Sequence, residues 1–549
     1  VRSVYEELLK PECTDGSTLP PLDQDDADWK KRLANYCFRD PEKALRLARA
    51  FVHGPGFGHV HPRTEKNARH MLARLFSLCP RRDQLPDNLG QPFPDGEPGA
   101  KRLSDPDRVL ARLDTFLTAY GSRALLLETW TANPLLFELL VLLFDRSEFL
   151  AETAIRTPDL VDSLEESGQL LRSKTADQTL KELWLRQYHQ TEVMRIGLRD
   201  ILGLADEEHC LAELSALADA CLQYALEVVW ASHSQGPIPM TVLGLGKLGG
   251  AEIDYGSDLD VLFVADNKAR DLPLLQRVAA AVIEIVSGQT HLGAAFKIDA
   301  RLRPDGEKGL LVNTLKVCVE YYRYRAQLWE IQALSRCRPV AGRLDIAARF
   351  EQALAALCNF GAPSTAAAAA QRADWKLEIA RMRHRIQKER TPPGKDRLAL
   401  KTGEGGLMDA EFLAQTLALE HGWREPNTLR ALQLARHHGA LPAAQAELLI
   451  QNFRKLRRVA RILRRWSYEG ETELPDDPAP LYRVAVRCGF TNAQDFLNAV
   501  ARYRRNIRSV YDLVFSPVAS SHGARSAPLQ SGGGRANSRE TGPADGDGQ

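Results

Sequence analysis

The sequence has almost no net charge. Its 72 lysine and arginine residues are balanced by 71 aspartate and glutamate residues, which leaves a formal charge of +1 over 549 residues. A chain with no excess of either sign generates no global field that could hold nucleic acid or an acidic membrane surface. We therefore expect neither nucleic acid nor a membrane among its partners, and any polyanionic ligand must be bound by a local group of residues.

Paired cysteines are also missing. The nine cysteines are odd in number, scattered along the chain and never spaced as C-x-x-C. This pattern argues against a disulfide framework and against a thiolate zinc site, so a reducing cytoplasm is the expected location.

No run of residues is apolar for long enough to suggest a membrane helix. The most apolar stretch, residues 124–144, is interrupted by Glu128, Asn133, Pro134 and Glu138. A spanning helix needs about 20 nearly uncharged residues. We expect this stretch to be buried helix instead, and the first residues of the chain carry no secretory signal pattern.

The length of 549 residues suggests about three or four domains. Leucine and alanine recur with helical spacing from 28 to 235, strand-like composition follows, and helical spacing returns from 346. Beyond 516 almost no large apolar residues occur. The sequence therefore predicts a multidomain α plus α/β protein, with a helical array at 28–235, an α/β domain at 236–345, a helical domain at 346–515 and a disordered tail at 516–549.

A short echo links the two ends of the chain. Residues 2–5 (Arg-Ser-Val-Tyr) recur as residues 508–511. Chance remains a real explanation for four identical residues. If the echo is not chance, residues 1–27 are the end of a preceding unit of the same kind, and a chain that opens at Val1 is a piece of a longer protein.

Three strand-like segments lie at 239–246, 259–265 and 294–303. The first of them ends in glycines, and further glycines follow it. Gly244, Gly246, Gly249 and Gly250 surround Lys247. Because glycine has no Cβ, the backbone N–H groups of such a loop can approach a phosphate closely. An acidic cluster rather than a helix follows, and the G-K-[S/T] ending of a P-loop is absent, so neither of those nucleotide-binding motifs applies.

Asp258 and Asp260 lie at the start of the second strand. Residues two apart on a strand point to the same face, so their carboxylates are expected to converge. Convergent carboxylates repel each other unless a cation lies between them, and oxygen ligands beside a phosphate-binding loop favour Mg²⁺. Asp299 on a neighbouring strand fits as a third carboxylate. The alternative is a solvated turn with capping aspartates.

The same spacing rule places Arg301 and Arg303 on the face of Asp299. Guanidinium groups there could bind phosphate oxygens. For Arg303, a structural ion pair explains the residue nearly as well.

The combined motifs resemble a known family. The pattern G-x-G-K-L-G-G-x-E, then S-D-x-D from Ser257, then D-x-R-L-R-P from Asp299 is similar to the nucleotidyltransferase core of glutamine synthetase adenylyltransferases, within the polymerase-β-like superfamily. Residues 329–338 resemble the W-E-x-Q-A-L-x-R-x-R segment of that family. Residues 400–415 resemble its K-x-x-x-G-G-x-x-D-x-E-F-x-x-Q signature.

The resemblance implies a core flanked by an N-terminal helical array and a C-terminal helical bundle. It implies catalysis with two Mg²⁺ ions held by Asp258, Asp260 and Asp299, and ATP as a substrate. AMP would go to a tyrosine of glutamine synthetase, with a PII-type signal protein as a further candidate partner. The nucleotide would be bound by Gly244, Gly246, Lys247, Gly249, Gly250, Ser257, Arg301 and Arg303.

Members of this family carry two such units, an N-terminal one that removes AMP and a C-terminal one that attaches it. Residues 303–311 and 332–334, together with Asp409, resemble the C-terminal, adenylylating unit more closely. Phosphorolytic removal of AMP and uridylylation of a signalling protein are the enzymatic alternatives. An inactive docking protein is the alternative of another kind, although three intact aspartates argue against it.

Three further groups carry separate expectations. Trp329 is expected in the core rather than as a platform for a base. Lys401, Asp409 and Glu411 lie at a glycine-rich helix start, where a capping role and a functional role are equally open. The basic amphipathic segment 454–465 is expected to be a solvated or partner-binding face.

Overall fold

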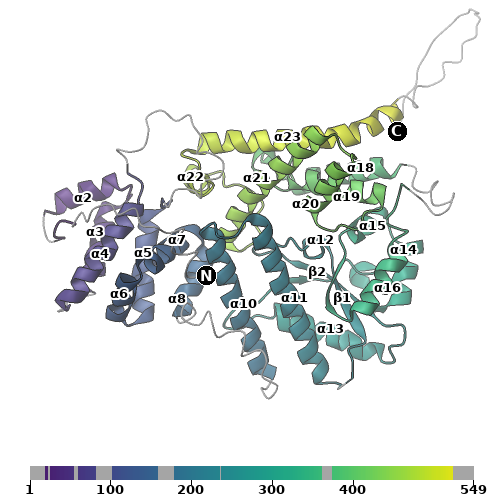
Figure 1. Cartoon of the computed structure of the whole chain (residues 1–549), viewed down its shortest axis with the longest axis horizontal. Coiled ribbons are helices and arrows are strands. Elements are labelled where there is room, and N and C mark those ends of the chain that lie inside the picture. Colours follow the sequence, from purple (N-terminus) through teal and green to yellow (C-terminus); the bar gives the residue numbers. More distant parts are fainter. Residues whose placement is uncertain are drawn as a thin grey trace, which may run out of the picture.

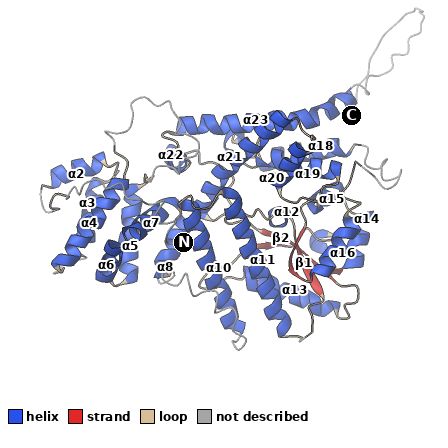
Figure 2. Cartoon of the chain, viewed as in Figure 1, coloured by secondary structure: helices blue, strands red, loops and turns tan. Residues whose placement is uncertain are grey.

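The computed structural model describes residues 19–22, 25–54, 60–81, 102–158, 178–234, 236–361 and 374–523, without the side chains of 178–180 and 516–523 (Figure 1). Helices dominate this part of the chain, and the strands form one small sheet (Figure 2). The expected end of a preceding unit, at 1–18, and the expected tail beyond 523 lie outside the described residues.

The N-terminal array consists of short helices whose starts are marked by proline and by capping side chains. Proline is the first residue of four of them, where its missing N–H costs no helical hydrogen bond. Asp40 and Asp105 each accept a backbone N–H at a helix start. The helices are α2 (Asp26–Asn35), α3 (Pro41–His53), α4 (Pro62–Leu78), α5 (Pro106–Tyr120), α6 (Arg123–Ala132), α7 (Pro134–Arg146) and α8 (Glu148–Arg156).

The apolar stretch 124–144 forms two helices rather than one, with α7 mostly buried and α6 buried on one side only. α6 and α7 are bent by 111° where they meet. Pro134 disfavours helical backbone at the residue before it, which explains the break. Leu127, Val141 and Phe144 are fully buried but Leu125 is 53% exposed, so the predicted burial is confirmed for α7 and for one side of α6.

Two long helices connect the array to the sheet. α10 (Gln178–Ile201) packs against α11 (Glu207–Ala231), and α11 in turn contacts the sheet. Among the described residues, α11 alone is long and apolar enough by composition to cross a membrane as a single helix, yet 56% of its most apolar window is buried inside the protein. It serves here as a core helix between α10 and the sheet.

The sheet has five strands, β1 (Met240–Gly244), β2 (Leu259–Ala265), β3 (Ile298–Asp299), β4 (Val312–Thr314) and β5 (Arg338–Gly342). β1 pairs antiparallel with both β2 and β5. β3 and β4 pair parallel with the other edge of β2. The register of β2 and β3 sets Asp260 opposite Asp299.

Helices from both sides cover the sheet. The helices within the α/β region are α12 (Gly246–Gly249), α13 (Leu272–Ser287), α14 (Leu315–Tyr324), α15 (Leu328–Leu334) and α16 (Leu344–Leu354), with a 3₁₀ turn, η4, at Gly306–Lys308. The C-terminal domain contains α18 (Trp375–Arg390), the 3₁₀ turn η5 (Asp396–Leu398), α19 (Leu407–His421), α20 (Thr428–His437), α21 (Ala443–Ser467), α22 (Pro478–Arg487) and α23 (Ala493–Gly523). α23 therefore continues past residue 516, where the tail was expected to begin.

Successive side chains of β2 belong to two different cores. Val261 and Phe263 pack with the N-terminal array, α11 and α13. Leu262 and Val264 pack with α14, α16 and the C-terminal helices. All four side chains are fully buried, so the sheet lies between two hydrophobic cores formed with different sets of helices.

The third strand is shorter than the sequence predicts. Only Ile298 and Asp299 of the segment 294–303 form a strand. The guanidinium of Arg303 donates to the carbonyl oxygens of Ala300, Glu307 and Gly309. These hydrogen bonds fold the loop after β3, residues 300–309, into a compact turn. The prediction that alternation continues to residue 303 is therefore wrong.

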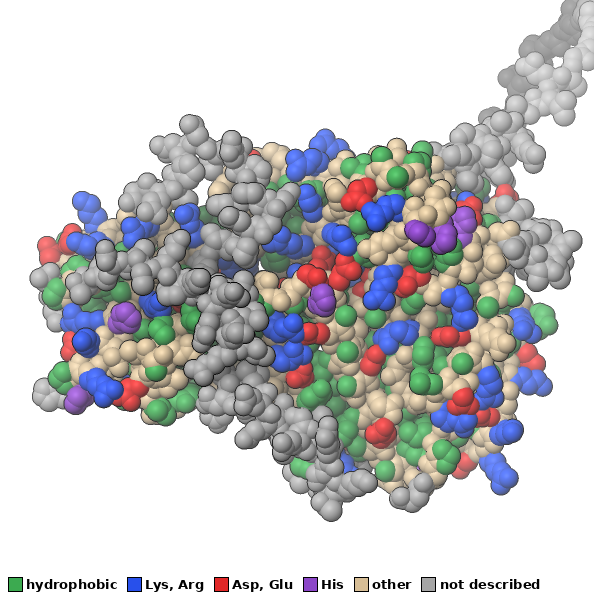
Figure 3. Space-filling model, in the orientation of Figure 1, with side chains coloured by type: hydrophobic (Ala, Val, Ile, Leu, Met, Phe, Trp, Pro, Cys, Tyr) green, Lys and Arg blue, Asp and Glu red, His purple; other side chains and the backbone are tan. Residues whose placement is uncertain are grey.

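Charged side chains of both signs are interspersed on the face of the molecule in Figure 3. The view agrees with the balanced composition, since no broad area of this face is covered by one sign.

Phe263→Ala should destabilise the protein by about 3–5 kcal/mol, because it deletes a fully buried aromatic side chain between the sheet and its helices. Leu344→Ala is the matched control, since Leu344 is 67% exposed, and should change stability by no more than about 0.5 kcal/mol. Chemical denaturation followed by circular dichroism compares the two. Equal effects would contradict the assignment of β2 to the core.

Candidate active site

A cavity of about 610 Å³ lies between the sheet and the C-terminal helices. From the α/β region it is lined by Gly246, Lys247, Ser257, Asp258, Asp260, Asp299, Arg301 and Trp329, among others. From the C-terminal domain it is lined by side chains that include Met382, Lys401, Met408, Glu411, Phe412, Gln415 and Arg464. The helical domain therefore supplies a large part of the wall.

The three predicted aspartates all line this cavity. Asp258 is exposed just before β2, and Asp260 lies beside Asp299 through the parallel pairing of β2 with β3. Burial, with the nearby charges of Asp299 and Asp258, raises the pKa of Asp260 to about 6, although Lys401 opposes the shift. Negative charge is thus concentrated at this end of the cavity.

Asp299 is engaged by Arg301. The Arg301 Nη2 atom lies 2.6 Å from Asp299 Oδ2, and the backbone N–H of Arg301 donates to Oδ1 at 2.8 Å. These hydrogen bonds lower the pKa of Asp299. Arg301 is therefore placed beside the carboxylates, as expected, but its charge is paired with one of them.

The donor set suits a hard cation such as Mg²⁺ without forming a finished cage. Within the described ranges, no three histidine, cysteine or acidic side chains lie at metal-ligand spacing. Mg²⁺ is usually bound by one or two carboxylates together with the phosphates of its substrate. Asp260 and Asp258, with Asp299 once Arg301 releases it, fit that mode of binding.

Gly246 brings the loop backbone against Asp260. Its φ is +54°, and a Cβ at this position would lie 2.5 Å from Asp260 Oδ2. A side chain would therefore both strain the backbone and displace the carboxylate. The contact found here is with Asp260, and the predicted approach of this backbone to a phosphate stays a prediction.

The other three predicted glycines do not line this cavity. A Cβ at Gly249 would lie 1.9 Å from the carbonyl oxygen of Arg336, and one at Gly244 would lie 2.8 Å from side-chain atoms of Leu248 and Val340. Gly250 borders a different cavity. These residues let the short α12 pack tightly against β1 and β5.

Lys247 lines the cavity, where its surroundings disfavour the protonated amine. Burial, and then the neighbouring cations Arg464 and Lys401, lower the pKa of Lys247 to about 7. A phosphate in the cavity would favour the charged amine. Arg303, in contrast, uses its donors on loop carbonyls and is absent from the cavity lining.

The loop that carries Asp258 rests on the turn after α21. Arg464 donates to Ser257 Oγ at 3.0 Å and to the carbonyl oxygen of Gly470 at 3.0 Å. Gly256, at φ +61°, lies so close to the Tyr468 carbonyl that a Cβ would be 2.1 Å away. The C-terminal domain thereby fixes the residues that lead into β2.

The basic face of α21 points inward, so the prediction of a solvated or partner-binding face is wrong for most of it. Arg457, Arg461, Arg464 and Arg465 are each less than a tenth exposed. Their spacing places them on one side of the helix. Three of them pair with acidic groups far away in the sequence, and Arg464 donates to Ser257 and Gly470 instead. No local pattern in the sequence reveals those partners.

Asp200 is one of these acidic partners. It pairs with Arg461 at 3.1 Å and with Arg465 at 2.8 Å, and it accepts a hydrogen bond from Tyr255 Oη at 3.2 Å. Burial alone would raise the pKa of Asp200, but the two arginines outweigh burial and lower it. Tyr255 belongs to the loop before β2, so the network reaches the active site.

Glu252 is the second partner. Arg457 approaches its Oε2 atom at 3.1 Å, Thr428 donates to its Oε1 atom at 2.6 Å, and Arg336 forms an ion pair with the same oxygen. Arg336 is the first arginine of the W-E-x-Q-A-L-x-R-x-R segment and lies just before β5. Glu252 therefore joins the loop, α20 and α21.

The charged residues at the glycine-rich start of α19 differ in their surroundings. Asp409 is fully buried, lies 2.6 Å from Arg383 and accepts the backbone N–H of Gly405 at 2.8 Å. It is a structural residue. Lys401 and Glu411 line the cavity and so remain candidates for function.

Trp329 is not in the core. Its side chain is 40% exposed, lines the cavity and donates to Gln327 Oε1 at 2.9 Å. The expectation of a buried tryptophan is wrong because the short α15 borders the cavity instead of crossing the domain. Gln332 of the same helix donates to Gln415 Oε1 at 2.7 Å and ties α15 to α19.

Together, the small mixed sheet, the glycine loop and the aspartates on β2 and β3 are consistent with a nucleotidyltransferase-type core. Comparison with known families gives the particular relationship. Residues 137–353 match the model of glutamate-ammonia ligase adenylyltransferase, and residues 374–515 match that of GlnD PII-uridylyltransferase. The chain is a relative of the glutamine synthetase adenylyltransferases, and its residues 137–353 belong to that family.

Individual relatives support this assignment. The chain is 32% identical over 418 residues to the bifunctional glutamine synthetase adenylyltransferase/adenylyl-removing enzyme of Aromatoleum aromaticum, over 71% of this chain and 42% of that protein. It is 30% identical over 445 residues to the protein of the same name from Mycobacterium tuberculosis strain H37Rv, over 75% of this chain and 44% of that protein. The chain thus spans less than half the length of these curated relatives. The family resemblance predicted from the motifs is confirmed.

Arg461→Met should lower the free energy of unfolding by about 2 kcal/mol or more, because it leaves the buried Asp200 without one of its cations. Arg458→Met is the control, since Arg458 lies on the exposed side of the same helix. Denaturant titration of both variants is the measurement. A larger loss for Arg458→Met than for Arg461→Met would contradict the inward orientation of the arginine row.

Proposed function

We propose that this chain transfers AMP from ATP to a tyrosine of glutamine synthetase. The observation that carries the proposal is the pairing of β2 with β3, which sets Asp260 beside Asp299 in a cavity that Asp258 and Lys247 also line. That cavity is formed in part by residues that match the adenylyltransferase model. Glutamine synthetase as the target comes from the names of the relatives.

Two Mg²⁺ ions, held by Asp258, Asp260 and Asp299, would supply charge neutralisation at the phosphoryl group being transferred. Asp260 and Asp258 would bind the ions on the β2 side of the cavity, and Asp299 would bind them on the β3 side. Arg301 must leave Asp299 for this to happen, and the freed guanidinium lies where it can contact a phosphate.

The attacking tyrosine has to lose a proton, because a free phenol has a pKa of about 10. Asp299 is the proposed acceptor, because its carboxylate lines the cavity beside Asp260, where the attacking hydroxyl would lie close to the metal-binding aspartates. Lys247 offsets charge on the departing pyrophosphate, because a nearby phosphate restores the proton that burial disfavours. Both roles use side chains that line the cavity.

The C-terminal domain completes the nucleotide site in this proposal. Met408 and Phe412 from α19, with Trp329 from α15, offer apolar surface to the base. The separate match of residues 374–515 to a PII-uridylyltransferase model makes a PII-type protein a candidate regulatory partner of this domain.

Wild-type protein incubated with Mg²⁺, labelled ATP and glutamine synthetase should label a tyrosine of the target. Asp258→Ala with Asp260→Ala should lower the rate at least about a hundredfold, because removal of the carboxylates that position metal and phosphate costs transition-state stabilisation. Asp345→Ala is the control, since this exposed carboxylate lies outside the cavity. Undiminished labelling by the double variant would refute the assignment of the aspartates.

The direction of transfer needs its own assay. Orthophosphate added to adenylylated glutamine synthetase should release little ADP if this unit attaches AMP. Faster ADP release than AMP attachment, at matched concentrations, would assign the unit to AMP removal instead. Tight binding of the target with no turnover of any nucleotide would favour the docking protein.

A further inference from the structure

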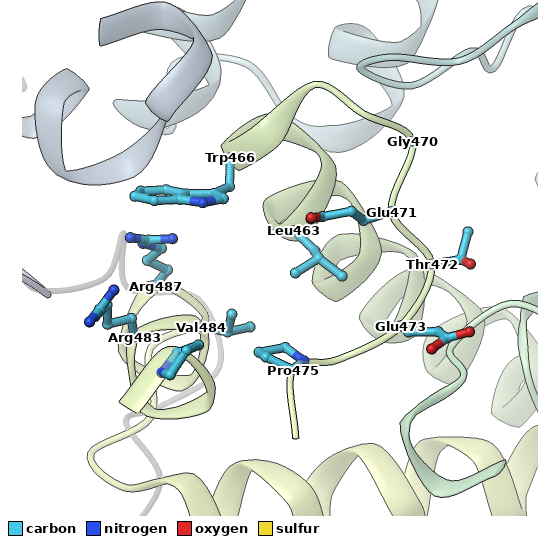
Figure 4. Close-up of a pocket in the computed structure, with 11 residues that line it drawn as sticks. Leu463, Trp466, Gly470, Glu471, Thr472, Glu473, Pro475, Arg483, Val484 and Arg487 are labelled. Carbon is cyan, nitrogen blue, oxygen red and sulfur yellow. The ribbon is translucent and has the colours of Figure 1, made fainter. Parts of the chain in front are cut away.

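A second cavity, of about 500 Å³, shares Gly470 and Thr472 with the candidate active site. Figure 4 shows the residues that line this second cavity. It is bordered by the end of α21, the segment 470–475 and α22. Leu463, Trp466, Pro475 and Val484 form its apolar lining, and the charged residues Glu471, Glu473, Arg483 and Arg487 face it. All of these residues are well away from the catalytic aspartates in sequence, and none of the roles described above uses the cavity.

Arg487 is a buried cation without a full set of partners. Its side chain is 8% exposed, and its guanidinium carbon lies 3.5 Å from the ring centre of Trp466. Arg108 from the N-terminal array covers the other face of the same ring at 3.7 Å. Nε of Arg487 reaches Ser104 Oγ at 3.3 Å, whereas Nη2 has no hydrogen-bond partner among the described residues.

The surroundings of Arg487 favour an anion. Burial above all lowers the pKa of Arg487 to about 9, and nearby Arg146, Arg465 and Arg483 add to the shift while Asp145 opposes it. Arg483 is itself paired with Asp105 at 3.3 Å. A buried guanidinium that lacks an ion-pair partner is costly, and an oxyanion is the group that its planar donor fork fits best.

The opposite wall limits how much negative charge the cavity accepts. Figure 4 shows Glu471 on the side of the cavity away from Arg487. Glu471 Oε2 has no hydrogen-bond partner in the described part of the chain, and burial raises the pKa of this carboxyl group. Glu473 faces the same space. A ligand with several negative charges would meet these carboxylates, whereas one with a single oxyanion group can pair with Arg487 and avoid them.

We infer that this second cavity is a regulatory site for a small molecule with one oxyanion group, carboxylate or phosphate, bound at Arg487. The inference that an anion binds rests on the cavity alone. The inference that this binding affects the active site also rests on the proposed function, because the effect is measured as a change in nucleotide affinity.

A short run of contacts connects the two cavities. Gly470 and Thr472 line both of them. The carbonyl oxygen of Gly470 accepts from Arg464, which also holds Ser257 next to the catalytic Asp258. The Thr472 carbonyl accepts the backbone N–H of Leu400 at 2.9 Å, beside the cavity residue Lys401. A ligand that shifts the segment 470–472 therefore moves groups on both sides.

Isothermal titration calorimetry with sodium acetate, inorganic phosphate and citrate tests the binding. The wild-type chain should bind acetate or phosphate at one site, and the tighter of the two identifies the oxyanion class. Citrate should bind at least about tenfold more weakly, since its further charges meet Glu471 and Glu473. Equal or tighter binding of citrate would overturn the single-charge requirement.

Two substitutions locate the site. Glu471→Gln should tighten anion binding at least about threefold, because it removes a repelling carboxylate and keeps the shape of the side chain. Arg487→Gln should abolish binding. Glu447→Gln, on the exposed surface of α21, is the control and should change nothing. If Arg487→Gln fails to fold, the Glu471→Gln result decides, and an unchanged affinity in that variant would refute the site.

Coupling is measured by titrating Mg²⁺-ATP with and without saturating anion. We expect at least about a twofold change in ATP affinity for the wild type, matched by the same factor when ATP is held saturating and the anion is titrated. No change in either titration overturns the regulatory role. A chain that binds the anion but never ATP would instead refute the proposed function and leave the anion site standing.

Discussion

The buried arginine row of α21 is the constraint on which the geometry of the candidate active site depends. Four guanidinium groups removed from water are tolerable only where each meets an acidic or polar partner. Their partners come from α10, from the loop before β2 and from the turn after α21 itself. Because these elements lie far apart in the sequence, one helix fixes the loop to both helical domains at once.

This arrangement explains why the α/β core has helices of such extent on both sides. The faces of β2 belong to separate hydrophobic cores, one shared with the N-terminal array and one with the C-terminal helices. Tyr255 and Ser257, on the loop that precedes β2, are held from α10 and α21. The aspartates therefore sit on a loop and two strands that neither helical domain could position alone.

Local patterns predicted the centre of the molecule well. The segment 259–265 is strand β2 as expected, and all three aspartates line one cavity because β3 pairs in parallel with β2 and sets Asp299 beside Asp260. The errors arise where distant residues decide. Arg303 binds carbonyls of its own loop and ends the third strand early, and acidic groups elsewhere turn the basic face of α21 inward. Trp329 lines a cavity that exists only once α15, α18 and α19 meet.

Hydrogen–deuterium exchange of residues 252–258 tests most directly whether α21 holds the loop of the candidate active site in place. Arg464→Gln removes the donors to Ser257 Oγ and the Gly470 carbonyl. Arg458→Gln, on the exposed side of the helix, is the control. We expect faster hydrogen–deuterium exchange in this loop for Arg464→Gln, with β1 and β5 still protected, and unchanged exchange for the control. Unchanged protection of the loop in Arg464→Gln would contradict it.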